Sequence, residues 1–436
     1  MVLEYRDRRS FLKATVGGAA AMTVAGCMGS LGDDDVTVGF PLPLSGEAGQ
    51  IGENMRDVHQ FLIDVVVNED HPDLDPFIFG DGEGLPNFGE TVNYQFVDHR
   101  GDPGEARAET RRLIQSHEVD LVVGATLSGA TRTARSVCEQ EGVPMVTGTA
   151  SGPELTEAGL EWFWRPTPHD GIFVQNTLEF LEDLNDHESL GPDISTAVIT
   201  HEDTEFGTGI ARIQEERAEE FGIDVLETIT YTAETLSSFS AQTDVIRDHD
   251  PDVLLHTGYF DDGILVMETF KERGYYPPMM LASGGLVIDS FYEDFEDLAN
   301  YQVQRSAFNR ELAEELPAIQ TYADMFTEET GQTLGSINMR AMNGSVVGLA
   351  AIDRAESTDP AEIQSTLNEL DLTRDEVGAP WDVEFDETGQ NPHATGVIQQ
   401  IHDAAPTMVW PFNLLEDFGA DVTDRLDYPT PAWDER

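Results

Sequence analysis

The stretch "VVGATLSGATRTARS", residues 122–136, joins a short apolar run to a loop of small residues and then to a helical pattern. Loops of small residues at the carboxyl end of a strand, followed by a helix N-terminus, are where open α/β sheets bind ligands. We therefore expect an α/β fold with a ligand site close to Ser128. A bound phosphate, a catalytic serine and a passively bound small molecule all fit this loop.

The same alternation of strand and helix continues along the chain in two runs of about four units each, separated by "WFWRPTPHDG" (162–171). Strands that alternate with helices of ten or more residues indicate βαβ units and parallel sheets. The sequence thus predicts two doubly wound parallel-sheet lobes. The expected strands are 36–42, 92–97, 119–123, 143–147, 196–200, 225–231, 253–257 and 279–282, and the expected helices are 50–67, 103–117, 129–141, 173–184, 206–221, 239–248 and 264–273.

After these two runs the pattern becomes helical and then returns to short strands. Helices are expected at 312–329, 339–356 and 360–370, with Asp359 as the cap of the last one. The segments "WDVEF", "TGVIQQI" and "TMVWP" that follow read as strands. A return to strands is expected if the chain crosses back from one lobe to the other.

The charge balance is extreme, with 83 Asp and Glu residues against 24 Lys and Arg and a formal net charge of −59. The acidic residues are spread along the whole chain, which indicates adaptation to solvent rather than an interaction tail. Molar salt screens such charge within about 3 Å, so we interpret the chain as the protein of an extreme halophile. Nucleic-acid binding is excluded because no basic stripe exists to neutralise phosphates.

The N-terminal residues resemble two export labels in the correct order. Arg8 and Arg9 with the residues after them resemble a twin-arginine signal, and the apolar stretch 14–26 is too short to span a bilayer. The residues before Cys27 resemble a lipobox, in which this cysteine is lipidated and becomes the new N-terminus. We expect a signal at 1–27, a linker at 28–35, and a protein held by lipid at Cys27 on the extracellular face of the membrane.

Enzyme motifs are missing from the sequence. There is no GxxxxGK[ST] loop, HExxH, CxxC or GxSxG, and the eleven histidines lack metal-ligand spacing. Cys138 is expected to be a buried apolar residue of a helix. The chain is therefore predicted not to be an enzyme and to use no cofactor and no metal.

One aperiodic stretch at 70–90 keeps two alternatives open. It is either a surface excursion or a calcium loop. Its spacing matches no EF-hand. The acids of the calcium alternative are Asp70, Asp73, Asp75, Asp81 and Glu83.

From residue 36 to 411 the chain resembles the type I periplasmic-binding-protein fold, and within it the leucine/isoleucine/valine-binding receptors of ABC importers. The resemblance is carried in order by "VGFPLPLSGEAGQIGENM" (38–55), the stretch that begins at residue 122, "HEDTEFGTG" (201–209) and "DPDVLLHTGYFDDG" (250–263). It implies a permease and an ATPase of an ABC importer as partners. Two alternative functions remain: a sensor that uses the same fold without transport, and an exported hydrolase.

The resemblance also implies how the lobes divide. The first lobe would contain 36–165 and 304–393, and the second 166–303 and 394–436. Three hinge segments would join them, near Arg165, near Gln304 and between Gln390 and Val397. Such lobes close over a ligand like a hinged trap.

The site residues follow from the same resemblance. Ser128, Thr149 and Ser151 would hold a ligand carboxylate, and Phe206 and Tyr259 would cover the ligand from the second lobe. Small side chains beside a helix N-terminus favour an anion, although Ser128 could also be a plain N-cap.

The sequence departs from the amino-acid receptors at one position. Their glutamate for the ligand ammonium would fall near Gly285, and a buried ammonium without a carboxylate is costly. Either the ligand lacks an α-ammonium or another acid supplies the charge, and we include Asp261 in the predicted site. The candidate acids are Glu202, Asp203, Asp261 and Asp262. The ligand class therefore stays open among amino acids, short amides or urea, and small carboxylates.

Overall fold

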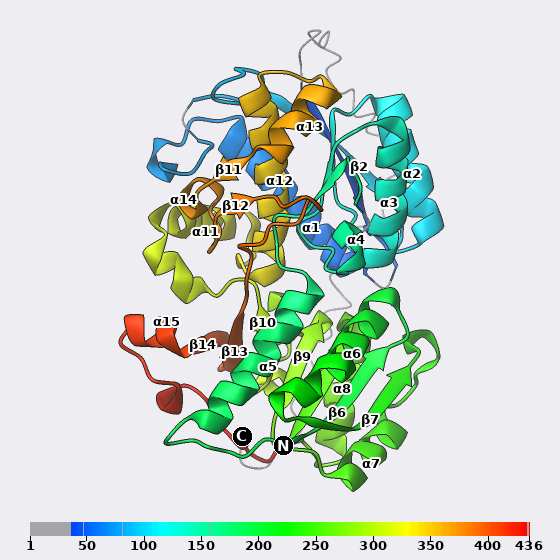
Figure 1. Cartoon of the computed structure of the whole chain (residues 1–436), viewed down its shortest axis with the longest axis vertical. Coiled ribbons are helices and arrows are strands. Elements are labelled where there is room, and N and C mark those ends of the chain that lie inside the picture. The colour runs from blue at the N-terminus through cyan, green and yellow to red at the C-terminus, as the bar shows by residue number, and fades with distance from the viewer. Residues whose placement is uncertain (1–35, 47, 81, 158, 434–435) are drawn as a thin grey trace, which may run out of the picture. The chain divides into compact units, whose positions relative to one another are not determined.

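The computed structural model describes residues 36–46, 48–80, 82–157, 159–433 and 436 (Figure 1). The predicted signal, linker and lipid-attachment residue, Cys27, lie outside the described residues. The described chain contains a five-stranded sheet and a seven-stranded sheet, each covered by helices, and we call the parts built around them the first and the second lobe.

The sheet of the first lobe has the order β2-β1-β3-β4-β5, and every neighbouring pair is parallel. The strand order changes direction between β1 and β3, which makes the carboxyl ends of these strands the place where such sheets bind ligands. The strands are β1 (Val36–Leu42), β2 (Val92–Asp98), β3 (Leu121–Val123), β4 (Met145–Val146) and β5 (Phe163–Trp164).

Helices cover both faces of this sheet (Figure 1). On one face α2 (Pro103–His117) packs against α3 (Ser128–Glu141), and on the other α1 (Gly49–Phe61) packs against α12 (Ser336–Ala355). The start of α2 is encoded locally, because the Asp102 side chain accepts from the Glu105 N–H and a proline follows it. The predicted helix 50–67 continues past α1 as a π-helical turn, Leu62–Val67.

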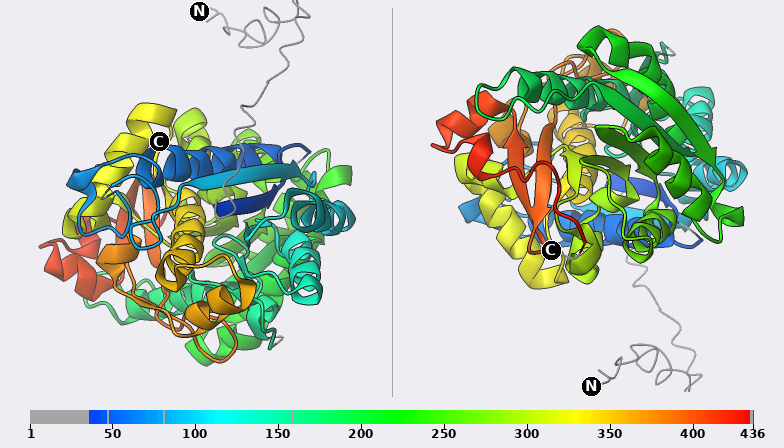
Figure 2. Two further views of the ribbon diagram at one scale, coloured as in Figure 1. Left: turned by 90° about the horizontal axis from the view of Figure 1, so that it is seen from above. Right: turned by 90° about the horizontal axis from the view of Figure 1, so that it is seen from below.

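The sheet of the second lobe has the order β14-β13-β10-β9-β8-β6-β7. Strands β6, β7, β8, β9 and β10 are parallel, whereas β13 pairs antiparallel with both β10 and β14, so the sheet is mixed rather than wholly parallel. Seen from below, this orange hairpin extends the sheet edge (Figure 2). The strands are β6 (Thr196–Glu202), β7 (Asp224–Tyr231), β8 (Val253–Gly258), β9 (Met280–Gly284), β10 (Val303–Ser306), β13 (Val397–His402) and β14 (Ala405–Trp410).

The faces of the second sheet are covered by two pairs of helices, α5 (Asp170–Asp186) with α6 (Glu205–Arg217) and α7 (Ser240–His249) with α8 (Phe260–Glu272). The strand order changes direction between β6 and β8, whose carboxyl ends therefore form the second expected ligand edge. The remaining elements are α4 (Glu154–Glu157), α9 (Asp289–Asp294), α10 (Glu296–Ala299), α11 (Pro317–Thr330), α13 (Pro360–Asn368), β11 (Asp371–Leu372), α14 (Arg374–Val377), β12 (Val383–Glu384) and α15 (Phe412–Asp417).

The chain passes between the two sheets after β5, after β10 and after β12. Gln304 lies inside β10 of the second sheet, so the second crossing follows Ser306 rather than beginning at Gln304. Arg165 of the first crossing forms an isolated bridge with Gln390 of the third, so these two segments run side by side. The detailed limits of the lobes and the hinge role of these crossings stay predictions.

The aperiodic stretch 70–90 packs on the first lobe by its apolar residues, since Leu74, Phe79 and Leu85 are fully buried. Asp70 accepts a hydrogen bond from the Gly82 N–H at 3.1 Å, while Asp81 lies outside the described residues. Within the described ranges, no group of three or more His, Cys, Asp or Glu side chains is placed to hold a metal ion. The same residues include no helix that is both long enough and apolar enough to cross a bilayer.

Candidate functional site

A small cavity of about 70 Å³ lies where the carboxyl ends of both sheets meet. Five of the six residues predicted to contact a ligand line it: Ser128, Thr149 and Ser151 from the first lobe, and Phe206 and Tyr259 from the second. The structure thus brings together residues that lie up to 131 positions apart in the sequence. The other lining residues are Ile51, Thr126, Leu127, Gly284, Val287, Arg305, Ser336, Ile337 and Arg340.

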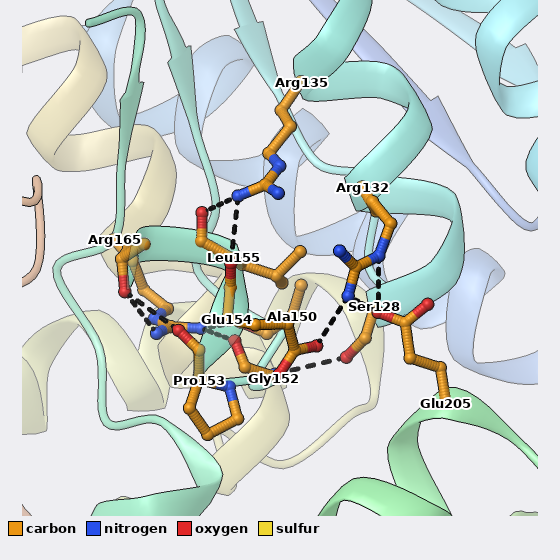
Figure 3. Close-up of polar contacts among 11 residues, drawn as sticks. Ser128, Arg132, Arg135, Ala150, Gly152, Pro153, Glu154, Leu155, Arg165 and Glu205 are labelled. Atoms are coloured by element: carbon orange, nitrogen blue, oxygen red, sulfur yellow. Dashed lines mark hydrogen bonds and ion pairs between the residues drawn. The ribbon is translucent and has the colours of Figure 1, made fainter. Parts of the chain in front are cut away.

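Ser128 is the first residue of α3 and is buried beside the cavity. The N-cap position is Leu127, whose apolar side chain makes no capping hydrogen bond. Ser128 is therefore not a plain N-cap. Its Oγ instead accepts from the backbone N–H of Gly152 at 3.2 Å (Figure 3). Because the oxygen accepts this bond, the hydroxyl proton of Ser128 is available for an acceptor in the cavity.

The loop that carries Thr149 and Ser151 follows β4 and is held from behind by Arg165 (Figure 3). This fully buried arginine donates from Nη1 to the carbonyls of Ala150 and Gly152, at 3.2 and 2.7 Å. The Ala150 and Gly152 carbonyls are thus occupied by an arginine that does not itself line the cavity. A buried guanidinium with these partners fixes the loop before any ligand binds.

Two aromatic side chains form the wall on the second lobe. The rings of Phe206 and Tyr259 stack with centroids 5.8 Å apart and an interplanar angle of 26°. Phe206 belongs to the first turn of α6, which Thr204 caps by accepting from the Gly207 N–H at 3.1 Å. Tyr259 precedes α8, where Asp262 accepts from the Tyr259 N–H at 2.8 Å. Both rings are therefore positioned by helix starts at the carboxyl ends of β6 and β8.

Two buried arginines in the cavity wall escaped the sequence analysis. Arg305 of β10 donates from Nε to Ser283 Oγ at 2.9 Å, and its Nη2 lies 3.4 Å from Asp170 Oδ1. Arg340 of α12 donates from Nη2 to the carbonyl of Thr149 at 2.7 Å. The Nε of Arg340 is buried and has no hydrogen-bond partner among the described residues.

The electrostatics of this wall are positive. Burial lowers the pKa of Arg340 to about 9, and the charge of Arg305 adds to the effect. Burial raises the pKa of Asp170, while the charge of Arg305 and a hydrogen bond from Ser151 oppose that rise. The charges of Arg305, Arg340 and Arg165 thus all act on the one carboxylate of Asp170, and the centroid of the Phe173 ring lies 4.0 Å from the Arg305 guanidinium carbon.

An ion pair joins the lobes at the edge of the cavity. Arg132 of α3 lies 2.6 Å from Glu205 of α6 and 3.1 Å from Glu154 of α4 (Figure 3). Burial acts to raise the pKa of Glu205, but the hydrogen bond and charge of Arg132 bring it below its usual value. Burial raises the pKa of Glu154. A neighbouring cavity, lined by Glu202, Glu205 and Tyr259 among others, continues from here.

A family model described as "Periplasmic binding protein" matches residues 35–405. The chain belongs to the periplasmic binding protein family. This match confirms the resemblance to periplasmic binding proteins that the sequence showed.

This binding protein is similar to relatives along most of its length. It is 25% identical to the Leu/Ile/Val-binding protein homolog 8 of Brucella abortus over 426 residues, which cover 94% of this chain and 97% of that one. The branched-chain amino acid transporter substrate binding protein LivJ of Streptococcus pneumoniae, solved with isoleucine, superposes with a TM-score of 0.72 at 18% identity and covers 87% and 100%. A solute binding protein of R. palustris, solved with benzoate, gives 0.71 at 14% identity and 86% and 95%.

The acids proposed for a ligand ammonium do not reach the cavity that holds Ser128. Asp261 and Asp203 are exposed, and Asp261 instead lines a neighbouring cavity with Glu202 and Asp262. Asp262 already accepts from the Tyr259 N–H and from the Tyr231 hydroxyl, and burial raises its pKa to about 6. Among the residues that the structure describes, no acidic side chain lines the Ser128 cavity.

At Gly285, where the resemblance would place a glutamate, the structure leaves no room for a side chain. A Cβ at Gly285 would lie 2.1 Å from the carbonyl carbon of Tyr259. The backbone before α8 therefore occupies the space that a side chain would need. Gly284, at a φ of +89°, lines the cavity with its backbone instead.

Nucleophilic chemistry finds no support at this site. Among the described residues, no histidine or cysteine lines the Ser128 cavity. Cys138 is buried in the helix that follows Ser128, as predicted, and burial raises the pKa of its thiol.

Proposed function

We propose that this protein is the extracellular receptor of an ABC importer, and that it captures a small polar ligand by closing its two lobes around the cavity that contains Ser128. The observation that carries the proposal is the convergence of three small polar residues and two aromatic residues, from opposite lobes, on one cavity. Cavities with apolar walls and a few convergent polar groups are typical of small-molecule sites.

Capture requires no chemical step. The first lobe offers the Ser128 hydroxyl and the loop at Thr149 to a carboxylate or carbonyl group, and the rings of Phe206 and Tyr259 cover the ligand and exclude water. A ligand that contacts both lobes binds only the closed form and shifts the population towards it. The closed form is then the state that a permease would recognise.

Binding is tested by titration calorimetry of the mature protein in 3 M KCl. The relatives solved with isoleucine and with benzoate make amino acids and aromatic carboxylates the first ligands to test, followed by short amides and urea. The proposal expects at least one class to bind with 1:1 stoichiometry. A folded protein that binds none of these ligands would contradict the proposal.

We also propose that the protein is exported by the twin-arginine route and anchored by lipid at Cys27. The variant Cys27→Ala is expected to appear in the culture medium, whereas the wild-type protein sediments with membranes. Replacing Arg8 and Arg9 by lysine is expected to keep the protein inside the cell. Release of wild-type and variant in equal amounts would contradict the anchor.

The acidic surface supports a halophilic origin. With a net charge of −59, self-repulsion weakens the folded state until salt screens it. The midpoint of thermal unfolding is therefore expected to rise by about 10 °C or more between 0.2 and 3 M KCl. A midpoint independent of salt would contradict this interpretation.

A further inference from the structure

We propose that the ligand of this receptor is an organic anion with an apolar body and no ammonium group, held through Arg340 and Arg305. The inference rests on the proposed function and narrows it. It excludes free α-amino acids, for which the sequence alone left room.

The first argument is the unused donor capacity of Arg340. This side chain is 5% exposed, lines the cavity and spends one Nη2 bond on the Thr149 carbonyl. Its Nε has no partner among the described residues. A buried guanidinium with an unmet donor is costly, and a ligand carboxylate removes that cost by a charge-assisted bond.

The second argument is the balance of charge around the cavity. Arg305 lines it too and is already paired with Asp170 at 3.4 Å, so the Arg340 charge has no carboxylate of its own in the described wall. A ligand with one negative charge neutralises the wall. An α-amino acid brings in addition an ammonium group, which would face two guanidinium groups.

The third argument is that none of the described residues lining the Ser128 cavity is acidic, whereas Glu202 lines the neighbouring cavities. Asp262 is occupied by the Tyr259 N–H and the Tyr231 hydroxyl, and Asp261 is exposed outside this cavity. At Gly285 the backbone of Tyr259 leaves no room for a side chain. An ammonium would be buried without a partner, which is strongly unfavourable.

The apolar residues of the cavity wall indicate the chemistry of the rest of the ligand. Its apolar side chains come from both lobes, and its polar part includes Arg340, which bonds to the Thr149 carbonyl. A branched aliphatic or aromatic carboxylate matches this division into one charged end and one apolar end. The apolar lining residues are Ile51, Leu127, Phe206, Tyr259, Val287 and Ile337.

The experiment compares ligands of one shape that differ only in charge. Calorimetric titrations in 1 and 3 M KCl would use 4-methylpentanoate, its amide, and leucine, and the aromatic set 3-phenylpropanoate, its amide and phenylalanine. We expect at least one acid to bind about a hundredfold more tightly than both its amide and its amino acid. The inference would be overturned if leucine or phenylalanine bound as tightly as the corresponding acid. It would also be overturned if acid and amide bound with equal affinity. Both outcomes would leave the receptor function intact. Failure of all six ligands, and of urea and the short amides, with a folded protein would contradict the receptor function itself.

Variants separate charge recognition from a structural role. Arg340→Met should abolish the preference for acid over amide, while Arg340→Lys should keep that preference at reduced affinity because it keeps the charge. Arg112→Gln, on the outer surface of α2, is the matched control and should change neither. The charge of Arg340 does not recognise the ligand if Arg340→Met folds and still prefers acid over amide. The same holds if Arg340→Lys and Arg340→Met both lose that preference.

Discussion

Nη2 of Arg132 on α3 lies 2.6 Å from Oε1 of Glu205 on α6, and this ion pair joins the two lobes beside the ligand cavity. The guanidinium also reaches Glu154 of the first lobe at 3.1 Å. Both partners of the pair are partly exposed, at 41% and 33%, so its strength is limited by solvent and by salt.

Breaking this pair should loosen the closed form only slightly. For Arg132→Gln we expect the ligand dissociation rate to rise by at most about fivefold, in line with about 0.2–1 kcal/mol for a partly exposed ion pair. The effect should shrink as KCl increases. Stopped-flow measurements would use Arg212→Gln as control, because Arg212 forms an exposed ion pair within α6 alone. A larger effect in the control would argue against an interlobe role.

Removing two hydroxyl groups should weaken the polar end of the site. We expect Ser128→Ala combined with Ser151→Ala to weaken binding at least about tenfold, since a single hydrogen bond to a charged group contributes about 1.5–3 kcal/mol and the Ser151 hydroxyl already bonds to Asp170. Calorimetry with the preferred ligand measures the change. Ser136→Ala on the outer part of α3 serves as control, and unchanged affinity of the double variant would place the ligand elsewhere.

The ring of Tyr259 should act on ligand release. Because the ring covers the cavity from the second lobe, Tyr259→Ala should raise the dissociation rate more than it lowers the association rate. Tyr259→Phe keeps the ring that stacks on Phe206 and should stay close to wild type. Stopped-flow kinetics would separate the two rates, and a dominant effect on association would contradict a covering role.

Three buried histidines should make the folded state sensitive to mild acid. Burial lowers the pKa of His59, His169 and His256 to about 3, whereas histidine in an unfolded chain titrates near 6.5. Between these values the unfolded chain binds more protons, so the free energy of unfolding falls as pH drops from 6.5 towards 3.

The expected loss is at most about 1.4 kcal/mol per pH unit for each histidine. Urea unfolding in 3 M KCl between pH 7 and 5 measures it. His256→Gln should flatten the dependence, and His393→Gln, at an exposed residue, should not. A denaturation midpoint that stays constant or rises from pH 7 to 5 would contradict the explanation.

The sequence predicted the elements of both lobes well, because each of them is specified locally. The strand 36–42 and the helix 103–117 occur at the predicted residues, since a buried apolar run and a proline-started, capped helix depend on nearby residues alone. The added antiparallel edge of the second sheet was not predicted, because the pairing partner of a terminal hairpin is a tertiary choice.

At the site, the loops were predictable and the charges were not. Ser128 and Tyr259 follow strands, and strand ends meet at one edge of a sheet, so their meeting could be expected. Arg305 and Arg340 lie inside a strand and a helix, away from the strand ends at which ligand contacts are expected. A cation on the inward face of an apolar element, in a chain so poor in cations, is the signal that could have found them.

Arg165 ties the first crossing to the third, donating from Nε to Gln390 at 2.7 Å while its Nη1 holds the carbonyls of Ala150 and Gly152. One guanidinium thus links the two crossing segments, about which the lobes would rotate, to the loop that would bind the ligand. Rotation of the second lobe would then be mechanically coupled to the position of this loop. A substitution at Gln390, which does not line the cavity, would therefore change the affinity for the ligand.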